Sequence, residues 1–201
     1  VRIDLPPADP DASPGEPFDP DALNLPPLSV AVDRLLVDRL LVVQGEQRYE
    51  VVHARLAALL DARAERPRLE LDLAELDLRL PDDLRLDARA AVALEPAGNL
   101  AVIGDAEFLL DHPQGWLAGR VDLEGALLGE LVLRPQLDWM GSDGLPAAAC
   151  GRLGLEGQRL SIDRLAVDGL GGRLELAGLV DWSSRPRLEL TGRGESIDPS
   201  W

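Results

Sequence analysis

The chain is dominated by short runs in which Leu or Val alternates with charged or small residues. In residues 171–190, GGRLELAGLVDWSSRPRLEL, Leu174 and Leu176 fall on alternate positions, and Leu188 and Leu190 repeat the pattern after the turn-like SSRP. Successive side chains of a strand point to opposite faces, so a period of two predicts amphipathic β-strands with one aliphatic and one charged face.

The same alternation recurs along most of the chain. In RLELDLAELDLRLP its phase shifts at Ala74–Glu75, which predicts a β-bulge that keeps both sets of Leu residues on one face. Further strand-like runs cover residues 84–94, 119–127 and 131–139. Pro135 inside the last run predicts a sheet edge or a bulge there, because proline cannot donate to a strand ladder.

One stretch permits two interpretations. LSVAVDRLLVDRLLVVQGEQRYEV reads as two strands with a turn at residues 44–46, but the following residues 49–63 are rich in Ala. Positions 52, 56, 59 and 60 fit the helical spacing, and Ala favours a helix. A short helix and a strand with poor alternation both remain possible here.

Residues 1–27 contain most of the prolines, interleaved with acidic residues, and are expected to form an extended linker. Asp9, Asp11 and Ser13 have the spacing that opens a calcium loop. Pro14 and Pro20 stand where the loop requires Gly and a bidentate Glu, so a linker is favoured over a calcium site.

A weak internal repeat indicates one repeated structural unit and not a mosaic of different domains. LAGRVDLEGAL at 117–127 aligns with LGGRLELAGLV at 170–180, about fifty residues later. That interval is close to two β-hairpins. Residues 28–201 are therefore predicted to form one all-β unit, an elongated, curled antiparallel sheet built strand after strand.

Composition excludes several functions. With a net charge of −16 and a pI near 4.4, the chain lacks the basic surface that binds a phosphate backbone. With 3% aromatic residues it also has few side chains on which nucleic-acid bases could stack, so nucleic-acid binding is excluded. All twenty basic residues are Arg, so lysine chemistry is excluded. Cys150, His53 and His112 form no metal-binding or catalytic motif. We expect no enzymatic activity, no cofactor and no metal.

The residues also resemble a known family. GGRLELAGLVDWSSRPRLELTGRGESIDPSW joins a Gly-Arg-Leu strand, an Asp-Trp, a Pro-Arg-Leu-x-Leu strand and a closing Asp-Pro. This combination, with the opening LPPLSVAVDRLLVDRLLV, resembles the β-rich periplasmic region of TamB, the translocation and assembly module subunit, and its AsmA-like relatives.

The resemblance implies a β-taco, a curled sheet whose concave face is a hydrophobic groove. It implies a periplasmic location in a protein anchored in the inner membrane, with TamA, an outer-membrane barrel, as partner. It further implies phospholipid transport to the outer membrane and support of outer-membrane protein and autotransporter assembly. The chain begins at Val1, and we expect it to be a piece of a longer protein whose anchor lies elsewhere.

The strand pattern leads to the same expectation independently, because a sheet with one aliphatic face must bury it against a second layer or a ligand. Acyl chains suit a face of Leu, Val and Ala, which offers burial without directional bonds. The residues predicted to line the lipid groove are Leu69, Leu71, Leu73, Leu76, Leu78, Leu84, Leu86, Val121, Leu123, Leu174, Leu176, Val180, Leu188 and Leu190.

Two other classes of function stay open. A β-sandwich or solenoid adhesion module would use the same Leu residues as a sealed core. A holdase-like scaffold would offer sheet edges to unfolded outer-membrane strands by β-augmentation.

Overall fold

The protein is one β-sheet in which each strand pairs with the next along the chain. The computed structural model describes residues 2–5, 28–44, 47–63, 67–95, 100–142, 144–169, 171–183 and 186–195. These residues form twelve strands and no helix. The strands are β1 (Arg2–Leu5), β2 (Ser29–Gln44), β3 (Gln47–Asp61), β4 (Arg68–Arg79), β5 (Arg85–Glu95), β6 (Ala101–His112), β7 (Gly115–Ala126), β8 (Glu130–Gly141), β9 (Pro146–Glu156), β10 (Arg159–Gly169), β11 (Gly172–Asp181) and β12 (Arg187–Glu195).

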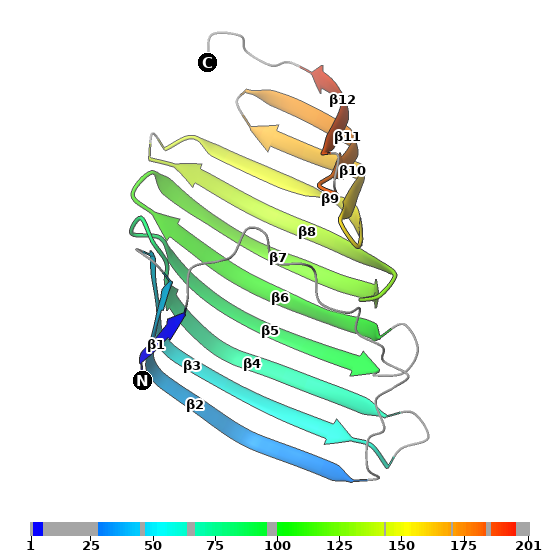
Figure 1. Ribbon diagram of the computed structural model, residues 1–201. Coiled ribbons are helices and arrows are strands. Elements are labelled where there is room, and N and C mark those ends of the chain that lie inside the picture. Colours follow the sequence, from blue (N-terminus) through cyan, green and yellow to red (C-terminus); the bar gives the residue numbers. More distant parts are fainter. Residues whose placement is uncertain are drawn as a thin grey trace.

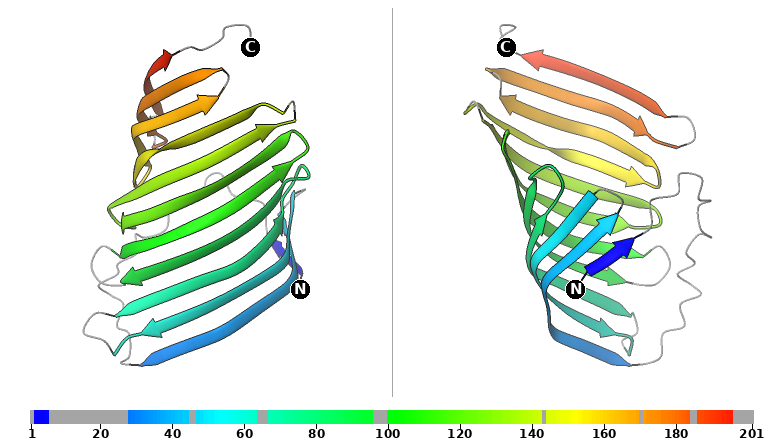
Figure 2. Two further views of the ribbon diagram at one scale, coloured as in Figure 1. Left: turned by 180° about the vertical axis from the view of Figure 1, so that it is seen from behind. Right: turned by 60° about the vertical axis from the view of Figure 1, so that its left-hand side comes forward.

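The strand order is the chain order, from β1 to β12 (Figure 1). All neighbours from β2 to β12 are antiparallel, and β1 alone pairs in parallel, with the last four residues of β2. The sheet is not closed, because β1 and β12 lie at opposite ends of the strand order and do not pair with each other. Figure 2 shows that it is curled, with strands that bend instead of lying in one plane. The prediction of an elongated, curled antiparallel sheet is confirmed.

β-bulges keep the aliphatic residues of a strand on one face where the alternation in the sequence shifts by one position. In β4, Leu73 pairs with Ala90 and Leu76 with Ala88, so one extra residue separates the two sets of Leu residues. This is the predicted bulge at Ala74–Glu75. A further register shift in β10 has the same effect, because Ile162 and Leu165 stay on one face although they are three residues apart.

The structure decides the open question at residues 49–63. Glu50 to Asp61 pair with both β2 and β4, and the segment belongs to strand β3. The helical spacing was misleading because β3 carries its own bulge at Val52, which disturbs the period of two.

The prediction for Pro135 is wrong. β8 lies between β7 and β9, and no register shift occurs at the proline. The ladder with β7 is continuous, whereas the ladder with β9 skips Arg134 and Pro135. A proline nitrogen that points toward β9 explains this gap, because it has no hydrogen to donate to the carbonyl of Gly151.

The expected linker at residues 1–27 contains strand β1 at its start. Its remaining residues, which include Asp9, Asp11 and Ser13, lie outside the described residues. The internal repeat has a structural counterpart, since its two copies fall on β7 and β11, four strands or two hairpins apart.

Candidate functional site: the apolar face

Cross-strand pairing gathers the aliphatic residues into continuous rows on one side of the sheet. Residues that pair across an antiparallel ladder share a face, so each row can be followed from strand to strand. The first row consists of Val30, Leu60, Leu69, Leu94, Val102, Gly125, Leu131, Leu155, Leu160, Val180 and Leu188. The second row consists of Val32, Ala58, Leu71, Val92, Gly104, Leu123, Leu133, Leu153, Ile162, Gly178 and Leu190.

Three more rows complete this side, which we call the apolar face. The third is Leu35, Leu56, Leu73, Ala90, Ala106, Val121 and Pro135, continued by Gly151, Leu165, Leu176 and Gly192. The fourth is Val37, Ala54, Leu76, Ala88, Phe108, Gly119, Leu137, Ala149, Val167, Leu174 and Gly194. The fifth is Leu40, Val51, Leu78, Leu86, Leu110, Leu117, Trp139, Ala147, Gly169 and Gly172.

The composition of the five rows is uniform. Every member is aliphatic, aromatic, proline or glycine, and no charged side chain interrupts them; the indole N–H of Trp139 is the only hydrogen-bonding group. With neighbouring strands about 4.8 Å apart, eleven strands give an apolar surface about 48 Å long.

The residues predicted from the sequence come together on this face. Thirteen of the fourteen lie in the five rows. Leu84 lies outside the strands, in the turn before β5, where its carbonyl oxygen accepts a hydrogen bond from the Leu80 N–H. The placement on one face follows from the register; contact with a lipid stays a prediction.

No second layer packs on the apolar face within the described residues. Extensive contacts between strands connect only neighbours in the sheet. The buried apolar residues of this face among the described residues are Ala54, Val102 and Leu131, and no large side chain is fully buried. Exposure is greatest at the ends of the sheet, where Leu188 is 66% exposed.

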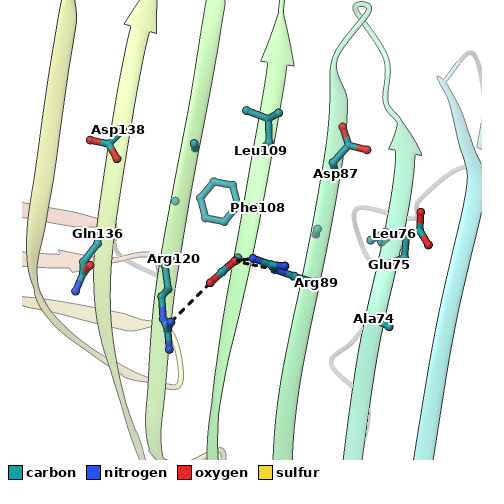
Figure 3. A pocket seen from close by; sticks show the side chains of 14 residues that line it. Ala74, Glu75, Leu76, Asp87, Arg89, Phe108, Leu109, Arg120, Gln136 and Asp138 are labelled. Carbon is teal, nitrogen blue, oxygen red and sulfur yellow. Dashed lines mark hydrogen bonds and ion pairs between the residues drawn. The ribbon is translucent and has the colours of Figure 1, made fainter.

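The opposite side, which we call the charged face, carries Arg–carboxylate pairs between strands. Arg89 of β5 donates to Glu107 of β6, and Arg120 of β7 approaches the same carboxylate at 3.6 Å (Figure 3). Arg85 bridges Asp77 and Asp87 in a similar way. The acidic residues thus alternate with Leu onto the solvated face, as their sequence positions predict.

The described hollows of the sheet open on this charged face. One of about 630 Å³ lies over β4 to β8 and is lined by residues such as Glu75, Asp87, Leu109 and Asp138 (Figure 3). Two of its arginines, Arg89 and Arg120, pair with Glu107. A second, of about 650 Å³, lies over β2 to β6 and includes Leu59 and Ile103.

Ion pairing shifts the pKa values of several exposed groups. Hydrogen bonding to Arg164, together with its charge, lowers the pKa of Glu175. Hydrogen bonds from Ser183 lower the pKa of Asp181. The hydrogen bond to Asp122 raises the pKa of Arg120 further. All three shifts favour the charged forms near neutral pH.

The histidines and the cysteine occupy separate places. His53 lies between two carboxylates, with Nδ1 2.7 Å from Asp38 Oδ1 and Nε2 3.8 Å from Glu75 Oε2. His112 accepts a hydrogen bond from the Gln114 N–H at a hairpin. Cys150 is an exposed free thiol on the charged face. Across the described ranges, no cluster of three or more ligating side chains fits a metal ion.

Neither the fold nor the comparisons with known proteins assign the chain to a family. No helix that is long and apolar enough to cross a bilayer occurs in the described part of the chain. No protein-family model, curated protein or solved structure matches the chain. The resemblance to the TamB family therefore rests on the quoted sequence features alone.

Sequence reasoning missed part of the apolar face. The rows also contain Leu131, Leu153 and Ile162, in strands where Pro, Gly and bulges blur the alternation. The missing signal was the hairpin register, since pairing with a clear strand assigns the face of an unclear one.

Proposed function

We propose that the apolar face carries the acyl chains of phospholipids, as part of a TamB-like lipid conduit in the periplasm. The observation that supports this proposal is the continuity of the five rows. Four of them cross eleven strands and the fifth crosses ten, and the indole N–H of Trp139 is the only polar group in their side chains. A water-soluble sheet of this size would ordinarily cover such a face with a second layer. The described residues contain no such layer, so the face requires an apolar ligand or another covering segment.

The chemistry of the face suits passive movement. Each buried methylene contributes about 0.8 kcal/mol, and no directional bond fixes its position. An acyl chain that moves from one row to the next exchanges one aliphatic contact for another of similar energy. Phospholipid delivery toward an outer-membrane barrel such as TamA, and support of outer-membrane protein and autotransporter assembly, remain part of the proposal by resemblance.

The alternatives differ in what they require of this face. A sandwich-type adhesion module needs a second sheet, and the described strands form one sheet only. A holdase-like scaffold would use the edge of β12, which pairs with no further strand among the described residues, and would coexist with a lipid-bearing face.

The test compares the same substitution on the two faces of one strand. Leu176 of β11 lies in the third row, whereas Leu179, opposite Ser161 and Glu189, lies on the charged face. The protein is purified without detergent, and bound phospholipid is measured by native mass spectrometry and lipid extraction. Transfer of a fluorescent phospholipid between vesicles provides the second measurement.

We expect Leu176→Asp to lose co-purifying lipid and transfer activity, and Leu179→Asp to keep both. Circular dichroism confirms that both variants are folded. A lipid-free wild-type protein that transfers no phospholipid would contradict the proposal, as would equal losses in the two variants.

A further inference from the structure

The charged face contains a hollow of about 420 Å³ that is lined by four arginines and no acidic residue. It is surrounded by Arg134 of β8, Arg152 of β9, Arg164 of β10 and Arg173 of β11. Successive members of this set are 9 to 18 positions apart in the sequence. In a chain with a net charge of −16 and 36 acidic residues, a hollow whose only charged lining residues are arginines is unexpected. We call this feature the arginine hollow.

The strand register holds like charges together at this place. Arg152 and Arg164 are direct cross-strand partners. Like charges in this position destabilise a sheet unless a counter-charge lies near. Elsewhere on the charged face, Arg89 and Arg120 both lie opposite Glu107, which is the favourable arrangement, although Arg79 also lies opposite Arg85.

Each arginine keeps hydrogen-bonding capacity for a ligand. Arg134 donates through Nη2 to Glu124 at 2.9 Å, Arg152 through Nε to Asp163 at 3.1 Å, and Arg164 through Nη2 to Glu175 at 2.5 Å. Arg173 lies 3.6 Å or more from its nearest carboxylates. Because a guanidinium has five N–H donors, most of the donors in the hollow are not used by these contacts.

From this geometry we infer that the arginine hollow binds a compact phosphate-bearing ligand. The planar guanidinium fork matches phosphate oxygens in a bidentate manner and is the preferred side chain for their recognition. The site is separate from the proposed lipid conduit, since it lies on the other face of the sheet.

The surroundings limit the size of the ligand. Glu124, Asp163, Asp168 and Glu175 flank the arginines and repel an anion that extends beyond them. Arg134 and Arg164 stand two strand spacings apart, or about 10 Å, which suits one to three phosphate groups. At physiological salt the Debye length is about 8 Å, so the local arginines outweigh the distant net charge.

The first experiment measures binding of inorganic pyrophosphate to the full chain by isothermal titration calorimetry. Arg152→Gln and Arg164→Gln remove charge-assisted donors, and each is expected to lower the affinity tenfold or more. Arg89→Gln, on the same face but outside the hollow, is the control and should bind like the wild type. Glu175→Gln releases Arg164 and Arg173 from their carboxylate and should strengthen binding, a gain that misfolding cannot produce.

A second measurement uses Cys150, the only cysteine in the chain, which lines the hollow. Pyrophosphate should slow its modification by a maleimide reagent in the wild type and much less in Arg164→Gln. Flotation with vesicles of phosphatidic acid in phosphatidylcholine, against phosphatidylcholine alone, distinguishes a lipid headgroup from a soluble phosphate.

Binding of either phosphate source that depends on Arg152 and Arg164 supports the proposal and identifies the source. It is overturned if neither binds at low salt, if Arg89→Gln loses as much affinity as the hollow variants, or if sulfate binds as tightly as pyrophosphate. Failure of the lipid-transfer test with intact pyrophosphate binding would affect the conduit proposal only.

Discussion

Phe108 of β6 lies directly opposite Gly119 of β7, and its ring occupies the space where a side chain would stand at Gly119. A Cβ at Gly119 would meet Phe108 Cζ at 2.9 Å and Leu137 Cδ2 at 2.6 Å. Both are ends of side chains in the fourth row of the apolar face. Phe108 is the only aromatic side chain in its row, and the glycine gives its ring room within the sheet.

We expect Gly119→Ala to destabilise the protein by about 1–2 kcal/mol, because neighbouring side chains must leave their rotamers. In a Phe108→Leu background the cost should be smaller, since the ring that obstructs the methyl group is gone. Urea unfolding of the four proteins in this cycle measures the coupling. Strict additivity of the two substitutions would show that the ring and the glycine are independent.

The repeated sequence places two glycines in equivalent positions, Gly125 in β7 and Gly178 in β11. Their φ values are 137° and 156°, and an added Cβ would lie 2.3 and 2.0 Å from the carbonyl oxygens of Glu130 and Glu189. Backbone atoms cannot move aside as side-chain ends do. The glycines therefore allow close approach of the next strand at both places.

Substitution of either glycine by Ala should cost about 1–3 kcal/mol, the usual range for a strained backbone position. Gly129→Ala is the matched control, because its added Cβ would meet only Ala126 Cβ at 3.4 Å, an ordinary contact. Thermal and urea unfolding measure the difference. Equal stability of Gly178→Ala and Gly129→Ala would contradict the role of close strand approach.

Much of the fold could be predicted from the sequence, because Leu and charged residues alternate clearly in most of the strands. Leu69 to Leu78 showed both the strand and its bulge, since a phase shift between two regular runs has one simple structural cause. At Val52 the same cause was hidden, because Ala-rich β3 alternates weakly and a helix fitted its spacing equally well.

The arginine hollow could not be predicted in this way. Arg134, Arg152, Arg164 and Arg173 have no common spacing, and their proximity depends on the register of three successive hairpins and on the bulge in β10. None of the four arginines lies in a basic segment of the sequence. A surface assembled from single residues of neighbouring strands appears only when the pairing is known.

A substitution at Pro135 tests why the pairing ladder between β8 and β9 is interrupted. Pro135→Val keeps an apolar residue in the third row and restores an N–H that points toward the carbonyl of Gly151. One added backbone hydrogen bond should stabilise the protein by about 1 kcal/mol, and valine favours strands. The urea midpoint should rise. A lower midpoint would instead mean that the fixed φ of proline supports the bend of β8.

The ion pair of Glu175 with Arg164 should make the stability of the folded protein depend on pH in the acid range. The folded-state pKa of Glu175 lies below the usual value of 4.5 because Arg164 bonds and attracts the carboxylate. This contribution to stability is complete above the pKa of the unfolded chain and is lost as pH falls through the lower folded value. Glu175→Gln should therefore be less stable than the wild type at pH 7 and equal to it in acid, below the folded-state pKa of Glu175. Glu156→Gln, at a carboxylate with no ion pair among the described residues, is the control for urea unfolding at both pH values. A deficit of Glu175→Gln that persists unchanged at low pH would assign the effect to packing and not to charge.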